Sequence, residues 1–142
     1  MTNFLAWYYC AMDAPEKKHT ILIVEDEPAQ LNVLSDAIQT SGFNTLKASD
    51  GPTGLKMALE HQPSLILLDN RMPQMSGYSM LRQIRAENNW GAKVPVIFFS
   101  NIPVSGHEEE TDIADAGVAY YLMKSDTSLV DLIAKIRTAI GI

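Results

Sequence analysis

Short runs of apolar residues alternate along this chain with longer segments in which apolar residues recur every three or four positions. Short apolar runs bounded by turn residues are typical of strands buried on both faces. The runs predicted to be strands are 21–24, 43–48, 65–68, 94–99 and 120–123. The second of them contains Asn44, Thr45 and Lys47, which indicates an edge strand with one face in water.

A segment with helical spacing follows each predicted strand. These five segments run from Pro28 to Gly42, from Asp50 to Pro63, from Gly77 to residues 88–91, from 106 to 117, and from the capping candidates Ser125, Asp126 and Thr127 to Ile140. The fourth is acidic and has only a thin apolar side, so it is expected to pack weakly. Weakly packed segments are the ones that move most readily.

Five strands that alternate with five helices predict a parallel sheet, because parallel neighbours need crossover connections that cover both faces. The fold class is therefore doubly wound α/β. In such sheets, ligands bind where the carboxyl ends of the strands meet. We expect residues that directly follow the strands to form one site.

Composition limits the functions that this chain can have. Its 142 residues suit one domain, and the net charge of −6 leaves no basic stripe for direct binding of nucleic acid. A divalent cation or a basic protein surface is a better partner. Cys10 is the one cysteine, which excludes an internal disulfide and a thiolate zinc site and favours a reducing cytoplasm.

Residues 1–19 differ in character from the rest and are interpreted as an extension that is disordered or not native. The stretch from Phe4 to Met12 is apolar and aromatic, but it is too short to span a membrane, and no Lys or Arg precedes it. Residues 1–11 are read as an upstream misassigned start or an added segment. A docking arm that uses Trp7, Tyr8 and Tyr9 is the alternative. The domain itself is placed at 20–142.

Chemically useful side chains follow four of the predicted strands. Glu25 and Asp26 follow the first, Asp69 the third, Ser100 ends the fourth, and Lys124 follows the fifth. Carboxylates that lie close together repel unless a cation offsets their field, and Mg²⁺ suits such oxygen ligands. A lysine and a hydroxyl beside them suit an incoming phosphoryl group, which one oxygen of Asp69 would attack in line.

Each of these residues also has a plain structural explanation. Asp69 could cap the helix that follows it, the acidic pair could be a solvated helix start, and Ser100 and Lys124 could be ordinary loop residues. What favours a site is that all four positions fall at the ends of the expected strands.

The chain resembles the receiver domain of two-component response regulators, from Thr20 to about Ile140. The motifs that carry the resemblance are ILIVEDEP, LILLDNRMPQMSG, VPVIFFS and AYYLMK. The resemblance implies the flavodoxin-like receiver fold, with strand order 2-1-3-4-5. It also implies that a histidine kinase or histidine phosphotransfer protein donates a phosphoryl group to Asp69.

The resemblance further assigns roles to the other residues. Mg²⁺ would be held by Glu25, Asp26, Asp69 and the backbone carbonyl of Arg71, while Ser100 and Lys124 would bind the phosphoryl group. Ser100 and Tyr121 would form the switch, although an aromatic at a strand end is more often packing. The output face would be the surface of the fourth helix, fifth strand and fifth helix, which would bind a downstream effector protein. The dimer state is left open.

Two positions depart from the family pattern. Ser125 stands where a proline usually follows the lysine, often through a cis bond, and a cis bond before a residue other than proline costs about 3–4 kcal/mol. We therefore expect either a trans bond or visible strain. Asn101 stands where a small alanine is usual, so it would crowd the phosphoryl site. Arg71 is hypothesised to lie over the phosphoryl group and to slow its hydrolysis.

The expected function is phosphotransfer signalling in the cytoplasm, without nucleic-acid or membrane binding and without catalysis beyond the protein's own phosphorylation and dephosphorylation. Three other functions are alternatives. A phosphatase with an aspartyl nucleophile would want a second acid at the position of Arg71. A flavodoxin-like nucleotide binder would be repelled by the acidic residues after the first strand, and an adaptor receiver that works without phosphorylation would not need the full acidic set.

Overall fold

The computed structural model describes residues 18–103 and 107–142, and the predictions made for residues 1–17 lie outside these ranges. Its centre is a parallel sheet with the strand order β2-β1-β3-β4-β5, as predicted. The strands are β1 (Thr20–Val24), β2 (Asn44–Ala48), β3 (Leu65–Leu68), β4 (Val96–Ser100) and β5 (Tyr120–Met123). The β1, β3 and β4 strands are almost entirely buried, which explains their continuous apolar sequences.

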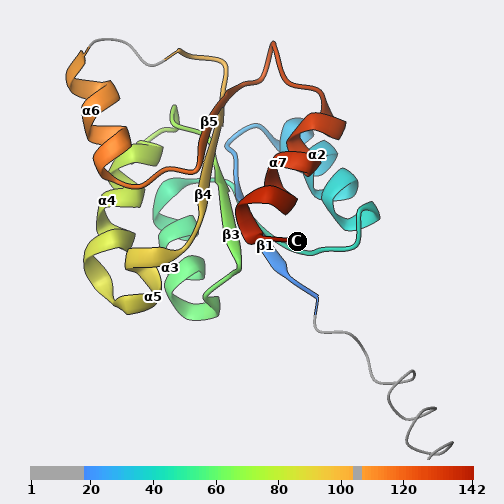
Figure 1. Ribbon diagram of the computed structural model, residues 1–142, viewed down its shortest axis with the longest axis horizontal. Helices are drawn as coiled ribbons and strands as arrows, with labels where there is room; N and C mark the ends of the chain where they lie inside the picture. The colour runs from blue at the N-terminus through green and yellow to red at the C-terminus, as the bar shows by residue number, and fades with distance from the viewer. Residues whose placement is uncertain (1–17, 104–106) are drawn as a thin grey trace, which may run out of the picture.

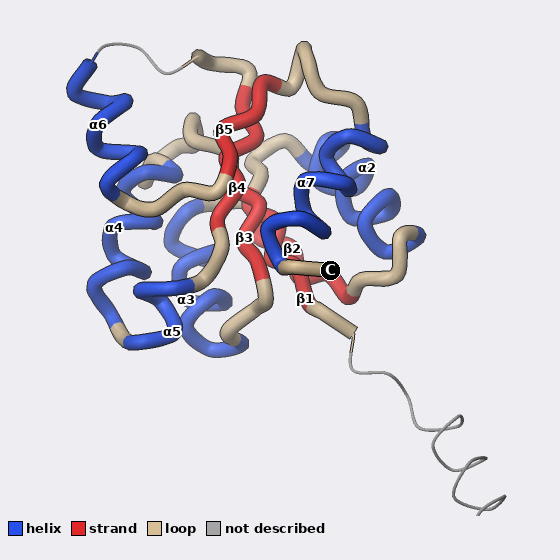
Figure 2. The backbone as a smooth tube through the Cα atoms, viewed as in Figure 1, coloured by secondary structure: helices blue, strands red, loops and turns tan. Residues whose placement is uncertain are grey.

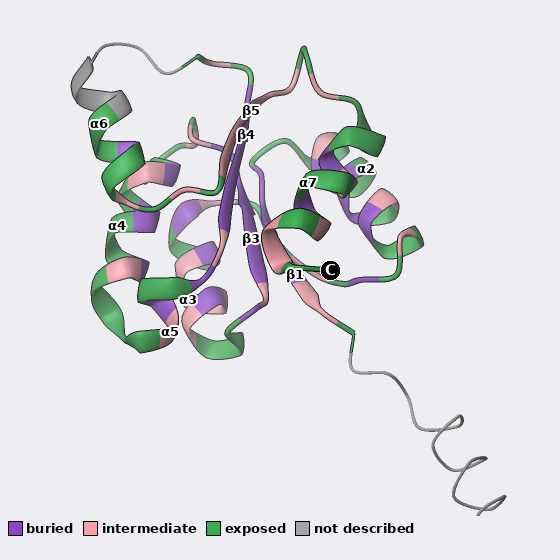
Figure 3. Cartoon of the chain, viewed as in Figure 1, coloured by how far each residue is buried: buried purple, intermediate pink, exposed green. Residues whose placement is uncertain are grey.

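Helices cover both faces of this sheet (Figures 1 and 2). One face carries α2 (Pro28–Thr40) and α7 (Leu129–Ile140), which bury Leu34, Ile38, Leu132 and Ile136 against it. The other face carries α3 (Gly51–His61), α4 (Gly77–Glu87), α5 (Asn89–Lys93) and α6 (His107–Asp115). Two apolar layers therefore hold the sheet, and Figure 3 shows the buried residues concentrated along the strands and on the inner sides of the helices.

The edge position predicted for the second strand is confirmed. The β2 strand pairs with β1 alone, and Asn44 and Lys47 are exposed to solvent on it. Helix α2 ends before Gly42, whose φ of +100° is a conformation that glycine adopts without strain.

Several sequence-based predictions of elements and boundaries are wrong. The prediction of five helices missed α5, which forms because the Asn88 side chain accepts a hydrogen bond from Gly91 N and caps a new helix. The last helix is capped by Ser128, which accepts from Asp131 N, instead of by residues 125–127. The fourth strand begins at Val96 instead of residue 94.

None of the helices in the described ranges has both the length and the apolar character that crossing a bilayer requires.

Candidate functional site

The backbone of the sheet places the predicted site residues at one edge. The hydrogen-bond ladder extends one residue past three strands: Glu25 N donates to Ala48 O at 3.0 Å, Asp69 N to Val24 O at 3.0 Å, and Lys124 N to Ser100 O at 2.9 Å. Each of these residues is therefore held by a neighbouring strand as well as by its own. The prediction that the strand ends converge is confirmed.

Together these residues line a pocket of about 280 Å³. Its walls are formed by Glu25, Asp26, Glu27, Asp69, Arg71, Ser100, Asn101, Ile102 and Lys124. Every residue predicted for the site lies on this pocket except Tyr121, and Ser125, which departs from the family pattern, does not line it either. Arg71 and Asn101 are both exposed to solvent at the pocket.

Three of the four acidic side chains that line the pocket lie close together. One oxygen from each of Glu25, Asp26 and Asp69 lies within 4.8 Å of the others. Glu25 and Asp69 are buried, with 3% and 8% of their surface exposed, whereas Asp26 is exposed. Burial raises the pKa of Glu25, and the nearby charge of Asp69 raises it further, against the lowering effect of Lys124.

Lys124 is the cation that faces this cluster. Its Nζ lies 2.7 Å from Glu25 Oε2 and 3.2 Å from Asp69 Oδ2. Burial alone would lower the pKa of Lys124, but the hydrogen bond to Glu25 and the charges of both carboxylates outweigh it and raise that pKa. One lysine charge thus faces three acidic side chains, and a hard cation with oxygen ligands fits the remaining negative field.

The Asp69 carboxylate is not a helix cap. Its Oδ1 accepts a hydrogen bond from Arg71 N at 3.2 Å, while Ser76 caps α4 by accepting from Ser79 N. The capping explanation for Asp69 is therefore wrong. Asp69 stands at the pocket with one oxygen toward the backbone of the following loop and the other toward Lys124.

The loop after Asp69 is fixed by contacts that the sequence analysis did not identify. Asn70 O accepts from Gly77 N at 2.9 Å, and Asn70 Oδ1 accepts from Tyr78 N at 3.1 Å. Gly77 packs so closely on the Asp69 carbonyl that an added Cβ would collide with it. The only sequence signal for this packing was the glycine itself, placed directly before an amphipathic helix.

Ser100 and Tyr121 both form hydrogen bonds with Ile102, a residue that no sequence pattern indicated. Ser100 Oγ accepts a hydrogen bond from Ile102 N at 3.2 Å, and the Tyr121 hydroxyl donates to Ile102 O at 2.7 Å. The Tyr121 ring also stacks on Phe98, with 5.5 Å between ring centroids. Because both contacts to Ile102 are made by its main chain, its identity carried no signal.

The peptide bond between Lys124 and Ser125 is trans, since no cis bond occurs within the described ranges. Of the two outcomes expected where serine replaces the usual proline, a trans bond or visible strain, the trans bond is observed.

Comparisons with known proteins agree with this geometry. The model of the response regulator receiver domain family matches residues 21–137. The polar-differentiation response regulator DivK of Brucella anthropi is 30% identical over 122 residues, which cover 86% of this chain and 96% of that protein.

Solved structures show the same fold. A CheY-like receiver domain protein from Methanospirillum hungatei has a TM-score of 0.79 and 23% identity over 88% of this chain and 95% of that one. The receiver domain of the sensor histidine kinase PA1611 from Pseudomonas aeruginosa, solved with a magnesium ion coordinated in its active site cleft, has a TM-score of 0.77 and 29% identity over 89% of this chain and 100% of that one. This chain belongs to the family of response regulator receiver domains, the signal-receiving domains of two-component systems.

Proposed function

We propose that Asp69 accepts a phosphoryl group from a phosphohistidine of a histidine kinase or histidine phosphotransfer protein. The observation that carries this assignment is the position of Lys124, whose Nζ binds both Asp69 Oδ2 and Glu25 Oε2 in the pocket. A lysine in this place can follow an oxygen of the arriving group, because its ammonium is a mobile point charge with three donors.

The reaction forms one bond and breaks one. An oxygen of Asp69 attacks phosphorus in line, the bond from phosphorus to the histidine nitrogen breaks, and the imidazole leaves with the electron pair and takes up a proton. Asp69 needs no general base, because a carboxylate is already ionised. Lys124 and the hydroxyl of Ser100 bind the equatorial oxygens, which spread the developing charge.

Glu25, Asp26 and Asp69, with the backbone carbonyl of Arg71, would hold Mg²⁺. When bound, this ion supplies positive charge beside the transferring phosphoryl group. Support comes from the three carboxylate oxygens within 4.8 Å of one another and from the magnesium ion in the active site cleft of the Pseudomonas receiver domain.

The phosphoryl group adds a charge of about −1.5 to −2 beside Lys124 and Ser100. A Ser100 hydroxyl that turns toward it gives up the hydrogen bond that it accepts from Ile102 N, while Tyr121 still binds the carbonyl of the same residue. The rearrangement of the Ser100 hydroxyl therefore reaches Ile102, which follows β4. The output surface is formed by α6, β5 and α7, and it binds a downstream effector protein in the cytoplasm.

In this proposal, residues 20–142 form the receiver domain, residues 1–19 are an extension, and the only chemistry is the protein's own phosphorylation and dephosphorylation. A phosphatase with an aspartyl nucleophile is disfavoured because Arg71 stands where its second acid is needed.

The test is to incubate the protein with Mg²⁺ and a small phosphoryl donor and to measure its intact mass. We expect a gain of one phosphoryl group that is absent in Asp69→Ala, absent after chelation of the metal, and retained in the control Asp115→Ala, which changes an exposed acid on α6. A wild-type protein that gains no mass would identify an adaptor receiver, and steady turnover of a phosphate ester would identify a phosphatase. Either result overturns the proposal.

We propose that Arg71 slows hydrolysis of the phosphoryl group on Asp69, because Arg71 lies on the pocket wall two residues after Asp69. Arg71→Ala is expected to lose the phosphoryl group faster than the wild type. An unchanged dephosphorylation rate would remove this role.

A further inference from the structure

The exposed large apolar side chains of the described residues are concentrated on one side of the molecule. Val33 lies on α2, Leu129 and Val130 lie on α7, and Ile142 ends the chain. Val130 is 79% exposed, although its neighbour Leu132 is buried in the core. A cluster of this kind usually marks a surface that something else covers.

A groove lies between these two helices. Its α2 wall is formed by Asp36, Ala37, Thr40 and Ser41, and its α7 wall by Leu129, Val130 and Ile133. Its volume is about 470 Å³, within the range of sites that hold several apolar groups. The groove is separate from the acidic pocket, with which it shares no lining residue.

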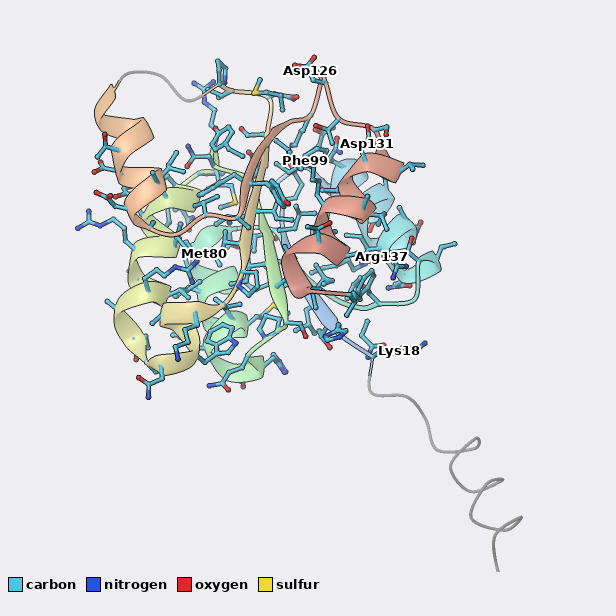
Figure 4. All side chains as sticks on the ribbon, in the orientation of Figure 1. Lys18, Met80, Phe99, Asp126, Asp131 and Arg137 are labelled. Atoms are coloured by element: carbon cyan, nitrogen blue, oxygen red, sulfur yellow. The ribbon has the colours of Figure 1, made fainter. Side chains whose placement is uncertain are left out.

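The chain enters the domain next to one end of this groove. Asn44 N donates to His19 O at 3.0 Å, and Asn44 lies three positions after Ser41. Ser41 O in turn accepts from Arg137 Nη2 at 2.7 Å, which ties this end of α2 to α7. Figure 4 shows Lys18 on the side of the sheet that carries Arg137. Residues that precede Lys18 therefore start close to the groove.

The preceding residues have the composition that the groove requires. Each of the nine residues from Phe4 to Met12 is apolar or aromatic, and this stretch lies outside the family match, which begins at residue 21. Met12 lies six positions before Lys18, so the tether between them spans at most ~22 Å. The tether carries two acids, Asp13 and Glu16, and two lysines, Lys17 and Lys18, so it has no net charge.

We propose that the segment Phe4–Met12 binds in the groove between α2 and α7 of the same molecule, with Trp7, Tyr8 and Tyr9 as its anchors. A short tether holds the segment at a millimolar effective concentration, far above that of a second molecule. Charge disfavours a second copy as the occupant, because two copies that each carry −6 repel.

The experiment uses the full chain labelled with 5-fluorotryptophan and observed by ¹⁹F NMR. The protein has two tryptophans, Trp7 in the segment and Trp90 on α5, so two resonances are expected, and Trp7→Phe assigns them. If the segment is bound, the Trp7 resonance in the native protein differs from that in urea. Val130→Asp should move the Trp7 resonance to its position in urea and leave the Trp90 resonance unchanged.

Val130→Asp suits this test because it removes an exposed side chain and places an acid in the first turn of α7, where the helix dipole favours it. The control Ser79→Asp places the same charge at an exposed position in the first turn of α4, on the other face of the sheet. It should leave both resonances unchanged.

Three results would overturn the proposal. The Trp7 resonance of the native protein could coincide with that in urea, which would mean that the segment is unbound. It could be shifted but insensitive to Val130→Asp, which would place the segment elsewhere. It could depend on protein concentration together with a dimeric mass in light scattering, which would make a second copy the occupant.

Discussion

The ammonium of Lys124 donates a hydrogen bond to Glu25 Oε2 at 2.7 Å, although the two residues are 99 positions apart in the chain. The same nitrogen lies 3.2 Å from Asp69 Oδ2. One side chain thus links the ends of β1, β3 and β5. In the protein without a bound cation, this lysine is the group that permits two buried carboxylates to lie side by side.

Removal of this cation is expected to destabilise the fold. Lys124→Met keeps much of the aliphatic stem but leaves Glu25 and Asp69 unpaired, so the free energy of unfolding should fall by about 2 kcal/mol, less than the full cost of breaking a deeply buried pair because the pocket opens to solvent. Urea unfolding of both proteins, in a buffer that contains a metal chelator, measures the difference in the free energy of unfolding. The control Lys56→Met, at an exposed position on α3, should change stability little. Equal stability of Lys124→Met and wild type would show that the pair is not structurally important.

Magnesium should stabilise the protein through the same pocket. An ion that binds only the folded state adds about 2.7 kcal/mol at a concentration of one hundred times Kd. Thermal unfolding with and without Mg²⁺ measures this gain, and chelation should reverse it. Asp26→Asn should lose most of the gain without harm to the core, because Asp26 is exposed. A full gain in Asp26→Asn would remove that residue from the ligand set.

The sheet and most of the pocket residues could be predicted from the sequence for a simple reason. Buried parallel strands have continuous apolar sequences that end where a polar residue appears, so Asp69 and Lys124 marked both the strand ends and the site. What sequence reasoning missed depends on the main chain or on local competition between caps. Ile102 acts through its N–H and C=O, and Ser128, instead of the equally suitable Ser125, captures the first turn of α7.

Arg85 is a second example of a contact hidden from the sequence. Its guanidinium donates to Ala116 O at 2.7 Å, Gly91 O at 2.8 Å, Val94 O at 2.7 Å and Gly117 O at 3.4 Å. It therefore joins α4 to α5 and to the residues that follow α5 and α6. In the sequence it is only one more charged residue on an amphipathic helix.

Arg85→Lys should lower the free energy of unfolding by about 2–3 kcal/mol, because a lysine lacks the planar fork and leaves half-buried carbonyls without donors. Urea unfolding measures this change. Arg82→Lys is the matched control, since Arg82 lies on the same helix, is exposed and contacts the Tyr78 ring at 5.9 Å. Losses of equal size in the two variants would mean that the carbonyl contacts of Arg85 add nothing to stability.

Asp50 gives a prediction about pH. Its Oδ1 accepts a hydrogen bond from Thr53 N at 2.7 Å, which lowers the pKa of the Asp50 carboxyl. A carboxyl whose pKa is lower in the folded state stabilises the fold above its ordinary pKa and loses this effect as the pH falls through its folded pKa. Asp50→Asn keeps a capping side chain but cannot titrate.

The stability of the wild type relative to Asp50→Asn should therefore be constant near neutral pH and fall once the pH drops below about 4. Urea unfolding over a pH series measures the difference, and Asp50→Ala should be less stable than the wild type near neutral pH because it has lost the cap. If the stability of the wild type relative to Asp50→Asn increased toward low pH, the argument that folding lowers the pKa of Asp50 would be wrong.

Gly77 tests whether the backbone after β3 positions Asp69. A Cβ at residue 77 would collide with Asp69 O and lie 2.9 Å from both Asn70 Cα and Phe98 Cε1. Gly77→Ala should therefore destabilise the fold by about 2 kcal/mol through overpacking. It should also slow phosphorylation of Asp69, although every side chain of the pocket is retained. Gly91→Ala is the control, because its Cβ would collide with Ile84 O, far from the pocket, and should cost stability without slowing phosphorylation. If both variants are phosphorylated at the wild-type rate, the close packing of Gly77 on Asp69 serves the fold alone.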